Sequence, residues 1–140
     1  MKILLAVDGS AYTKKMLAYL VAHNEVFGTA SQYTVFTAQP PLPPRVRAAV
    51  GASTLNGYYA DEVEKIMGPV CKFLLRHAIE AKSEWKSGPA GEAISKFAQA
   101  GKFDMIIMGS HGHGALANLV MGSVATQVLA HSTVPVLLVR

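Results

Sequence analysis

The 140-residue sequence lacks several features that would assign it to other classes of protein. Its single cysteine, Cys71, excludes an internal disulfide, and we expect it to be a small buried side chain. No apolar run approaches the ~18 residues that a membrane-spanning helix needs. Only 16% of the residues are charged and 51% are hydrophobic, which excludes a disordered chain. The length suits one folded domain over residues 1–140.

Basic residues are missing from the last part of the chain, since no lysine or arginine lies between Lys102 and Arg140. The net charge of +4 comes from residues scattered over the earlier segments. Nucleic-acid-binding proteins usually cluster basic residues on one face, so we expect no nucleic-acid partner. The five apolar residues 3–7 are too few for the core of a signal peptide, so we expect a soluble cytoplasmic protein without a membrane partner.

Strand-like and helix-like segments alternate along the chain. The apolar patterns predict strands at 2–7, 32–38, 82–87, 103–108 and 134–139, and helices at 10–27, 58–81, 89–101 and 123–131. The strands are apolar on both faces, which indicates a parallel sheet covered by helices on both sides. We therefore expect an α/β three-layer sandwich with five parallel strands and about four helices.

Two segments are expected to depart from this regular alternation. Residues 39–57 hold four prolines and two glycines, which predicts a mobile loop. Gly68 and Pro69 lie inside the helix predicted at 58–81 and should kink it, because proline removes one helical hydrogen bond.

A glycine-rich stretch after the fourth strand carries the strongest functional signal. It reads Gly109-Ser-His-Gly112, and Gly122-Ser123 follows at the start of a predicted helix. Glycines allow close approach of backbone N–H groups to a ligand, and a helix N-terminus favours a phosphate. Asp8 and Ala38 also end predicted strands, so these three segments should converge on one crevice at the carboxyl edge of the sheet.

Known phosphate loops fit this stretch only in part. Gly109 and Gly114 have the spacing of a Walker loop, but Ala115 stands where that loop needs lysine. Gly112 to Ala117 fits a dinucleotide fingerprint loosely, yet no acidic residue follows Asp104 to bind a ribose. A flavin-binding protein could have the same kind of sheet, but its loop would follow the first strand.

The longer spacing Gly109-x2-Gly112-x9-Gly122-Ser123 resembles the nucleotide-binding signature of the universal stress protein family. The resemblance covers the whole chain. Its other parts are Ala6–Ser10, Gly91–Ile94, Asp104–Gly112, Gly122–Val124 and Val134–Val139.

This resemblance implies a fold of the adenine nucleotide alpha hydrolase type, which is Rossmann-like, with strand order 3-2-1-4-5. It also implies ATP or a related adenine nucleotide such as AMP as the ligand, with or without magnesium. The residues that would contact the nucleotide are Ala6, Val7, Asp8, Ala38, Met108, Gly109, His111, Gly112, Gly122, Ser123, Val124 and Ala125.

Two positions depart from the family pattern. The family often has Lys or Arg where this chain has His113, and Ser or Thr where it has Ala125. Both changes remove partners of a phosphate, so we expect weaker or more pH-sensitive phosphate binding.

Several residues have a structural role as an alternative to a functional one. His111 and His113 are spaced for a metal, but no cysteine or acid follows nearby, so we expect no metal site. We expect His111 to shape the loop or contact phosphate, and His113 to be exposed.

Asp8 could contact the ligand or cap the first helix, and Ser10 could also cap that helix. The other histidines should lie on helix surfaces or ends: His23, His77 and His131.

These features favour a binding module, an intracellular adenine-nucleotide sensor for stress response or signalling. The loop region holds no general base, nucleophile or basic clamp, so we assign no catalytic residue and expect at most slow ATP hydrolysis. One alternative is a weak ATPase or phosphotransferase, and another is a dimeric structural protein that binds no nucleotide. The resemblance implies a homodimer formed through the last strand, Val136–Val139, and an unpaired apolar edge would otherwise favour aggregation.

Overall fold

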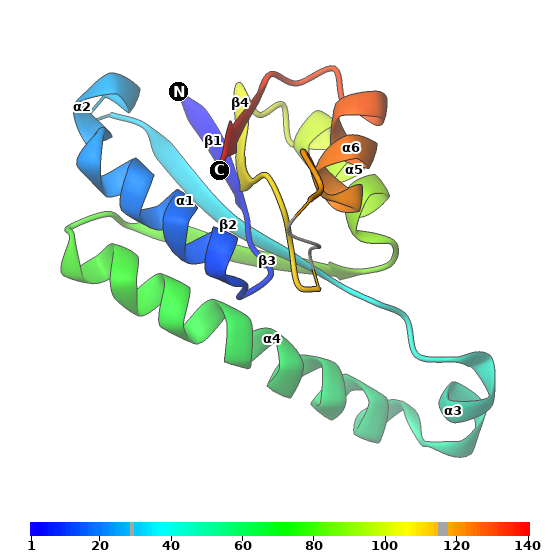
Figure 1. Ribbon diagram of the computed structural model, residues 1–140. Helices are drawn as coiled ribbons and strands as arrows, with labels where there is room; N and C mark the ends of the chain where they lie inside the picture. The colour runs from blue at the N-terminus through cyan, green and yellow to red at the C-terminus, as the bar shows by residue number, and fades with distance from the viewer. Residues whose placement is uncertain (29, 115–117) are drawn as a thin grey trace.

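The computed structural model describes residues 1–28, 30–114 and 118–140, and its centre is a five-stranded parallel sheet (Figure 1). The strand order is β3-β2-β1-β4-β5, as predicted. Ala115 and Ala117, which entered the comparison with known phosphate loops, lie outside the described residues. The strands are β1 (Lys2–Ala6), β2 (Gln32–Gln39), β3 (Ala81–Ser87), β4 (Met105–Gly109) and β5 (Val136–Val139).

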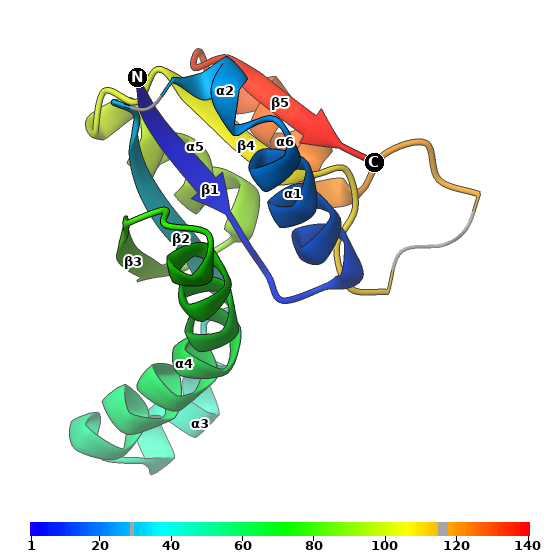
Figure 2. The same cartoon turned by 90° about the vertical axis from the view of Figure 1, so that its left-hand side faces the viewer.

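Helices cover both faces of the sheet, which confirms the three-layer sandwich (Figure 2). On β1, Ile3 and Leu5 join the core beneath α1 (Ala11–Ala22) and α4 (Ala52–Arg76). Leu4 and Ala6 point to the other face and join the core beneath α5 (Ala90–Ala100) and α6 (Ser123–His131). This alternation follows from the two-residue period of a strand, and burial on both faces explains the continuous apolar sequence of β1.

The register of the strands aligns their carboxyl ends at one edge. Ala6 of β1 pairs with Phe36 of β2 and with Met108 of β4. The segments that follow these pairs therefore emerge side by side, although they are distant in the sequence. In the parallel arrangement this is the edge at which ligands bind.

The prediction of a loop over residues 39–57 was wrong. Residues Pro44–Ala49 form the short helix α3, and α4 begins at Ala52, six residues earlier than its predicted start. Pro44 occupies the first turn of α3, where a missing N–H is tolerated. Buried Tyr59 anchors the segment, because its hydroxyl accepts a hydrogen bond from the Leu42 amide at 3.0 Å and its ring lies 5.7 Å from the Trp85 ring.

The described residues hold six helices instead of about four. The predicted helix 10–27 is divided at His23 into α1 and α2 (Asn24–Phe27). Pro69 lies inside α4, which continues through it as one helix, and the predicted kink remains a prediction.

Cys71 is half-buried instead of buried. It lies on α4 above β3, and its Sγ is 3.2 Å from the Ser83 hydroxyl. Because β3 is an edge strand, the contact between α4 and β3 is open to solvent on one side. Among the described residues, no helix combines the length and the apolar character of a membrane span.

Candidate functional site

The turn after β1 positions a carboxylate at the carboxyl edge of the sheet. The chain turns through Gly9, whose φ of +76° is a left-handed conformation that suits glycine. The Asp8 Oδ1 accepts hydrogen bonds from the Ser10 amide and the Thr13 hydroxyl, both at 2.9 Å. Asp8 therefore holds the first turn of α1 in place, which was one of the two roles expected of it.

Ser10 stands at the N-cap position of α1, as predicted, but its side chain makes no cap hydrogen bond. Its hydroxyl is buried and has no hydrogen-bond partner among the described residues. The Asp8 carboxylate instead accepts a hydrogen bond from the Ser10 amide, so the side-chain hydrogen bond at the start of α1 comes from the aspartate and not from the serine.

The glycine at the end of β4 allows α1 to approach the sheet. A Cβ at Gly109 would lie 2.6 Å from the Tyr12 Cβ and 3.1 Å from its backbone carbonyl. After Gly109 the chain is fixed to β5, because the buried Ser110 donates its amide to the Val139 carbonyl at 2.8 Å. No other residue type fits at Gly109 without a shift of α1.

Gly112 and Gly122 allow close contacts that hold the two ends of the loop together. The Gly122 amide donates to the Ser110 carbonyl at 2.7 Å, and a Cβ at Gly122 would lie 3.0 Å from the His111 Cα. A Cβ at Gly112 would lie 2.7 Å from the Asp8 Oδ2. The second carboxylate oxygen of Asp8 thus lies directly against the loop backbone.

Both loop histidines bind backbone carbonyls. The His111 Nε2 donates to the Leu119 carbonyl at 2.7 Å, because a carbonyl can only accept. The His111 Nδ1 lies 2.8 Å from the Ser110 hydroxyl oxygen and forms a hydrogen bond with it. The exposed His113 donates from Nε2 to the Asp8 carbonyl at 2.7 Å.

Of the two roles expected of His111, these bonds support the shaping of the loop, and contact with a phosphate stays a prediction. The His111 ring, 4.8 Å from the Tyr12 ring, fixes the shape of the loop. His113 is exposed, as predicted, and it also ties the loop to the β1–α1 turn. Within the described residues, no group of three or more His, Cys, Asp or Glu side chains could hold a metal ion.

The start of α6 presents amide groups to the same space. Gly122 is its N-cap, and Ser123, Val124 and Ala125 form its first turn. The first amides of a helix have no acceptor within the helix and lie at its positive end. Ala125 is buried with 2% exposure, whereas Ser123 is exposed.

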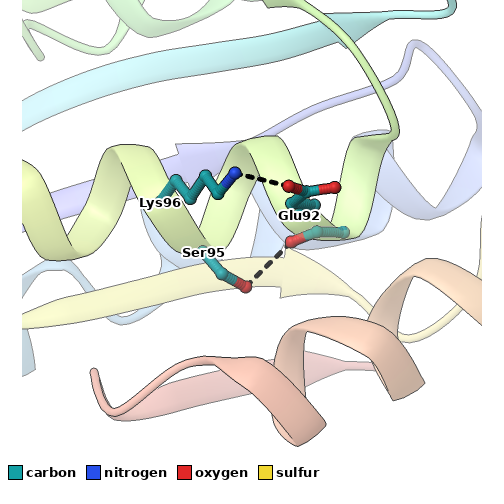
Figure 3. Close-up of polar contacts among 4 residues, drawn as sticks. Glu92, Ser95 and Lys96 are labelled. Atoms are coloured by element: carbon teal, nitrogen blue, oxygen red, sulfur yellow. Dashed lines mark hydrogen bonds and ion pairs between the residues drawn. The ribbon is translucent and has the colours of Figure 1, made fainter.

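The position of α6 depends on its contact with α5. A Cβ at Gly91 would lie 2.5 Å from the Gln127 Cβ, so glycine is required where the two helices meet. The Ser95 hydroxyl donates to the Gly91 carbonyl at 2.8 Å (Figure 3). On the exposed side of α5, Lys96 forms an ion pair and hydrogen bond with Glu92, and this partner lowers the pKa of the Glu92 carboxyl (Figure 3).

Together these segments enclose a cavity of about 280 Å³. All twelve residues predicted to contact a nucleotide line it: Ala6, Val7, Asp8, Ala38, Met108, Gly109, His111, Gly112, Gly122, Ser123, Val124 and Ala125. The structure thus brings the predicted residues together, and their contact with a ligand stays a prediction. Asp8 is the one acidic residue among the described lining residues, which include no lysine or arginine.

Six further residues line the cavity: Thr13, Ala90, Ile94, His113, Gly114 and Leu119. Ala90 and Ile94 belong to the start of α5, which the parallel topology brings to the carboxyl edge of the sheet. Leu119 is positioned by its bond to His111. His113 and Gly114 directly follow Gly112 in the sequence, and this position could have identified them as lining residues.

The chain is similar to known proteins in sequence and in fold. The model of the Universal stress protein family matches residues 1–140. A universal stress protein of Thermus aquaticus is 31% identical over 138 residues, which cover 99% of this chain and 97% of the relative. A universal stress protein of Synechocystis is 29% identical over 99% of this chain, which spans 42% of that relative's length.

Solved structures share the fold. The protein MJ0577 of Methanocaldococcus jannaschii has a TM-score of 0.81 and 28% identity, with 99% of this chain and 94% of that chain covered.

Two more distant neighbours were solved with nucleotides. An Arabidopsis thaliana family member with AMP bound has a TM-score of 0.70 and 12% identity, over 99% of this chain and 90% of that one. A universal stress protein in complex with cAMP has a TM-score of 0.63 and 22% identity, over 100% of this chain and 97% of that one.

The full-length match to the family model, the 31% identical relative and the shared strand order lead to one conclusion: this chain belongs to the universal stress protein family.

Proposed function

We propose that this chain is a cytoplasmic stress-response module that binds an adenine nucleotide, ATP or a related compound such as AMP, in the cavity at the carboxyl edge of the sheet. The observation that carries the proposal is the convergence of the β1–α1 turn, the glycine loop and the start of α6 on one cavity of about 280 Å³. That volume is close to the lower limit of small-molecule sites, on the order of 300 Å³. The neighbours solved with AMP and cAMP support the choice of an adenine nucleotide.

The lining divides into an apolar part and a backbone-rich part. Val7, Ala38 and Met108 provide the apolar surface suited to a nucleoside, with the Asp8 carboxylate beside them. Gly112 and the first turn of α6 provide amide groups suited to a phosphate. In this proposal the nucleoside lies against the strand ends and the phosphate against α6.

We propose a binding role and no catalytic residue. The Asp8 carboxylate already accepts two hydrogen bonds through Oδ1, and both histidines donate to backbone carbonyls. These contacts fix the cavity wall and engage the Asp8 Oδ1 and the Nε2 atoms of both histidines. We therefore propose that hydrolysis is at most slow, and that magnesium, where present, enters only with the nucleotide.

The same proposal treats residues 1–140 as one stress-protein domain that pairs with a second copy through β5. β5 is an edge strand whose side chains at Val136, Leu137 and Leu138 are only half-buried. Apolar edges of this kind favour pairing with another strand. Light scattering at micromolar concentration should give the mass of two chains, and the mass of one chain would contradict this part.

Mass spectrometry of small molecules extracted from the purified chain tests the binding proposal. The expected result is an adenine nucleotide released on denaturation. A complementary calorimetric titration with adenine nucleotides detects binding where the ligand is lost during purification. Absence of both, at nucleotide concentrations up to the millimolar range, would overturn the proposal.

A further inference from the structure

The cavity described above has an unusual charge balance for a nucleotide site. Its described lining includes one carboxylate, Asp8, and no fixed positive charge. The residues between Gly114 and Asn118, outside the described part, are Ala, Leu and Ala and add no charge. No lysine or arginine occurs anywhere between Lys102 and Arg140, so neither the loop nor α6 can supply a cation from its own sequence.

The groups that can bind phosphate are correspondingly few. They are the amides of the first turn of α6 and the Ser123 hydroxyl, together with the loop amides near Gly112. Other polar groups are committed elsewhere: the Gly122 amide donates to the Ser110 carbonyl, and the Thr13 hydroxyl donates to Asp8. A helix N-terminus carries about half a positive charge, which matches one phosphate group and not a chain of three.

The remaining side chains near the loop do not extend this set. The Nε2 atoms of His111 and His113 donate to the carbonyls of Leu119 and Asp8. The Asp8 Oδ2 lies against the backbone at Gly112, where it adds negative charge beside the phosphate region. Each further phosphate would bring negative charge to this region that no lysine or arginine of the described lining balances.

Basic residues elsewhere do not line the cavity. Arg140 follows β5 at the same edge of the sheet, but it is exposed and not part of the lining. Lys15, on α1, has its ammonium 4.7 Å from the centre of the Tyr12 ring. The local shortage of positive charge is therefore a property of the cavity, despite the net charge of +4 of the chain.

From these observations, and resting on the proposed function, we infer that the cavity selects adenine nucleotides with a single phosphate over those with three. One phosphate satisfies the amides of α6 and the loop, and the second and third phosphates of ATP add no affinity. The chain would thus respond to AMP or a comparable monophosphate rather than to ATP.

Calorimetric titration of the full chain with adenosine, AMP, ADP and ATP tests this inference, with each nucleotide measured with and without magnesium. AMP should bind about tenfold or more tightly than adenosine, because its phosphate gains charge-assisted hydrogen bonds. ATP should bind no more than about threefold more tightly than AMP, or more weakly. Binding of ATP that exceeds this limit, with or without magnesium, would overturn the inference and leave the proposed function intact. Absence of binding by all four compounds would instead overturn the proposed function.

A variant with an added charge provides the complementary test. His113→Arg places a fixed cation at the cavity and should raise the affinity for ATP relative to AMP by about fivefold or more. Thr54→Arg, on the exposed start of α4, adds the same charge away from the cavity and should leave the ratio unchanged. An unchanged ratio in His113→Arg, or an equal rise in both variants, would contradict the role of missing cavity charge.

Discussion

The glycines around the cavity and those at the start of α4 occur for different physical reasons. At Gly109, Gly112 and Gly122 an added Cβ would lie 2.6, 2.7 and 3.0 Å from its nearest neighbour. At Gly51 and Gly57 an added Cβ would meet nothing within 4 Å. The first set is required by close approach of backbone and side chains, whereas the second set is not constrained by packing. The sequence separates the two sets by their spacing, and the structure adds the packing that requires a glycine in the first set.

The largest expected effect is on stability at Gly109. Gly109→Ala would push a methyl group into the Tyr12 backbone and displace α1 from β4. We expect the free energy of unfolding to fall by about 2–3 kcal/mol, the cost of overpacking a tight contact. Urea denaturation measures it, and a variant as stable as the parent would show that α1 can move away without cost.

The next effect is on binding at Gly112. Gly112→Ala places a Cβ 2.7 Å from the Asp8 Oδ2, so either the loop or the carboxylate must shift. We expect the affinity for AMP to fall by about tenfold, which corresponds to ~1.4 kcal/mol, because the phosphate amides lose their positions. Calorimetry measures the affinity, and equal binding by parent and variant would remove Gly112 from the site.

A smaller effect of opposite sign is expected at Gly57. Gly57→Ala replaces an exposed glycine inside α4, where alanine is more favourable in a helix by roughly 0.5–1 kcal/mol. The free energy of unfolding should rise by about that amount while AMP affinity stays unchanged. A loss of stability would indicate that this end of α4 is not helical in solution.

The smallest effect concerns the exposed pair Glu92 and Lys96. The pKa of Glu92 is lowered by Lys96, so its contribution to stability is present above the ordinary pKa of glutamate, about 4.3, and is lost as the pH falls below it. Glu92→Gln should therefore lower the melting temperature slightly at pH 7. The difference from the parent should shrink as the pH falls through that range, and a difference independent of pH would exclude this pair as its cause.

The alternation of strands and helices, and the convergence of three strand ends on one crevice, could be predicted because their signals are local, whereas the strand order and the twelve lining residues were implied by the resemblance to the family. The apolar run of β1 and the spacing of Gly109, Gly112 and Gly122 are sequence patterns with a direct physical meaning. The predicted residues at three strand ends converge because parallel strands end at the same edge of a sheet.

The helices at residues 44–57 could not be predicted in this way. The prolines and glycines there favour a loop by local preference, but Tyr59 anchors the segment through its bond to Leu42 and its contact with Trp85. Such a contact joins residues far apart in the sequence and leaves no local pattern.

The hydrogen-bond acceptors of the two loop histidines were missed for a related reason. Their acceptors are backbone carbonyls of Leu119 and Asp8, and a carbonyl has no signature in the sequence. Whether His113 is available to a phosphate depends on its hydrogen bond to the Asp8 carbonyl, in a turn more than a hundred positions earlier in the sequence. Residue type alone therefore did not reveal these hydrogen bonds.

Titration of the parent chain with AMP, alongside Gly112→Ala and Gly57→Ala, tests the central claim most directly. We predict that the parent and Gly57→Ala bind AMP equally and that Gly112→Ala binds it about tenfold more weakly. Equal affinity in all three, or no binding by the folded parent, would contradict the assignment of this cavity as the nucleotide site.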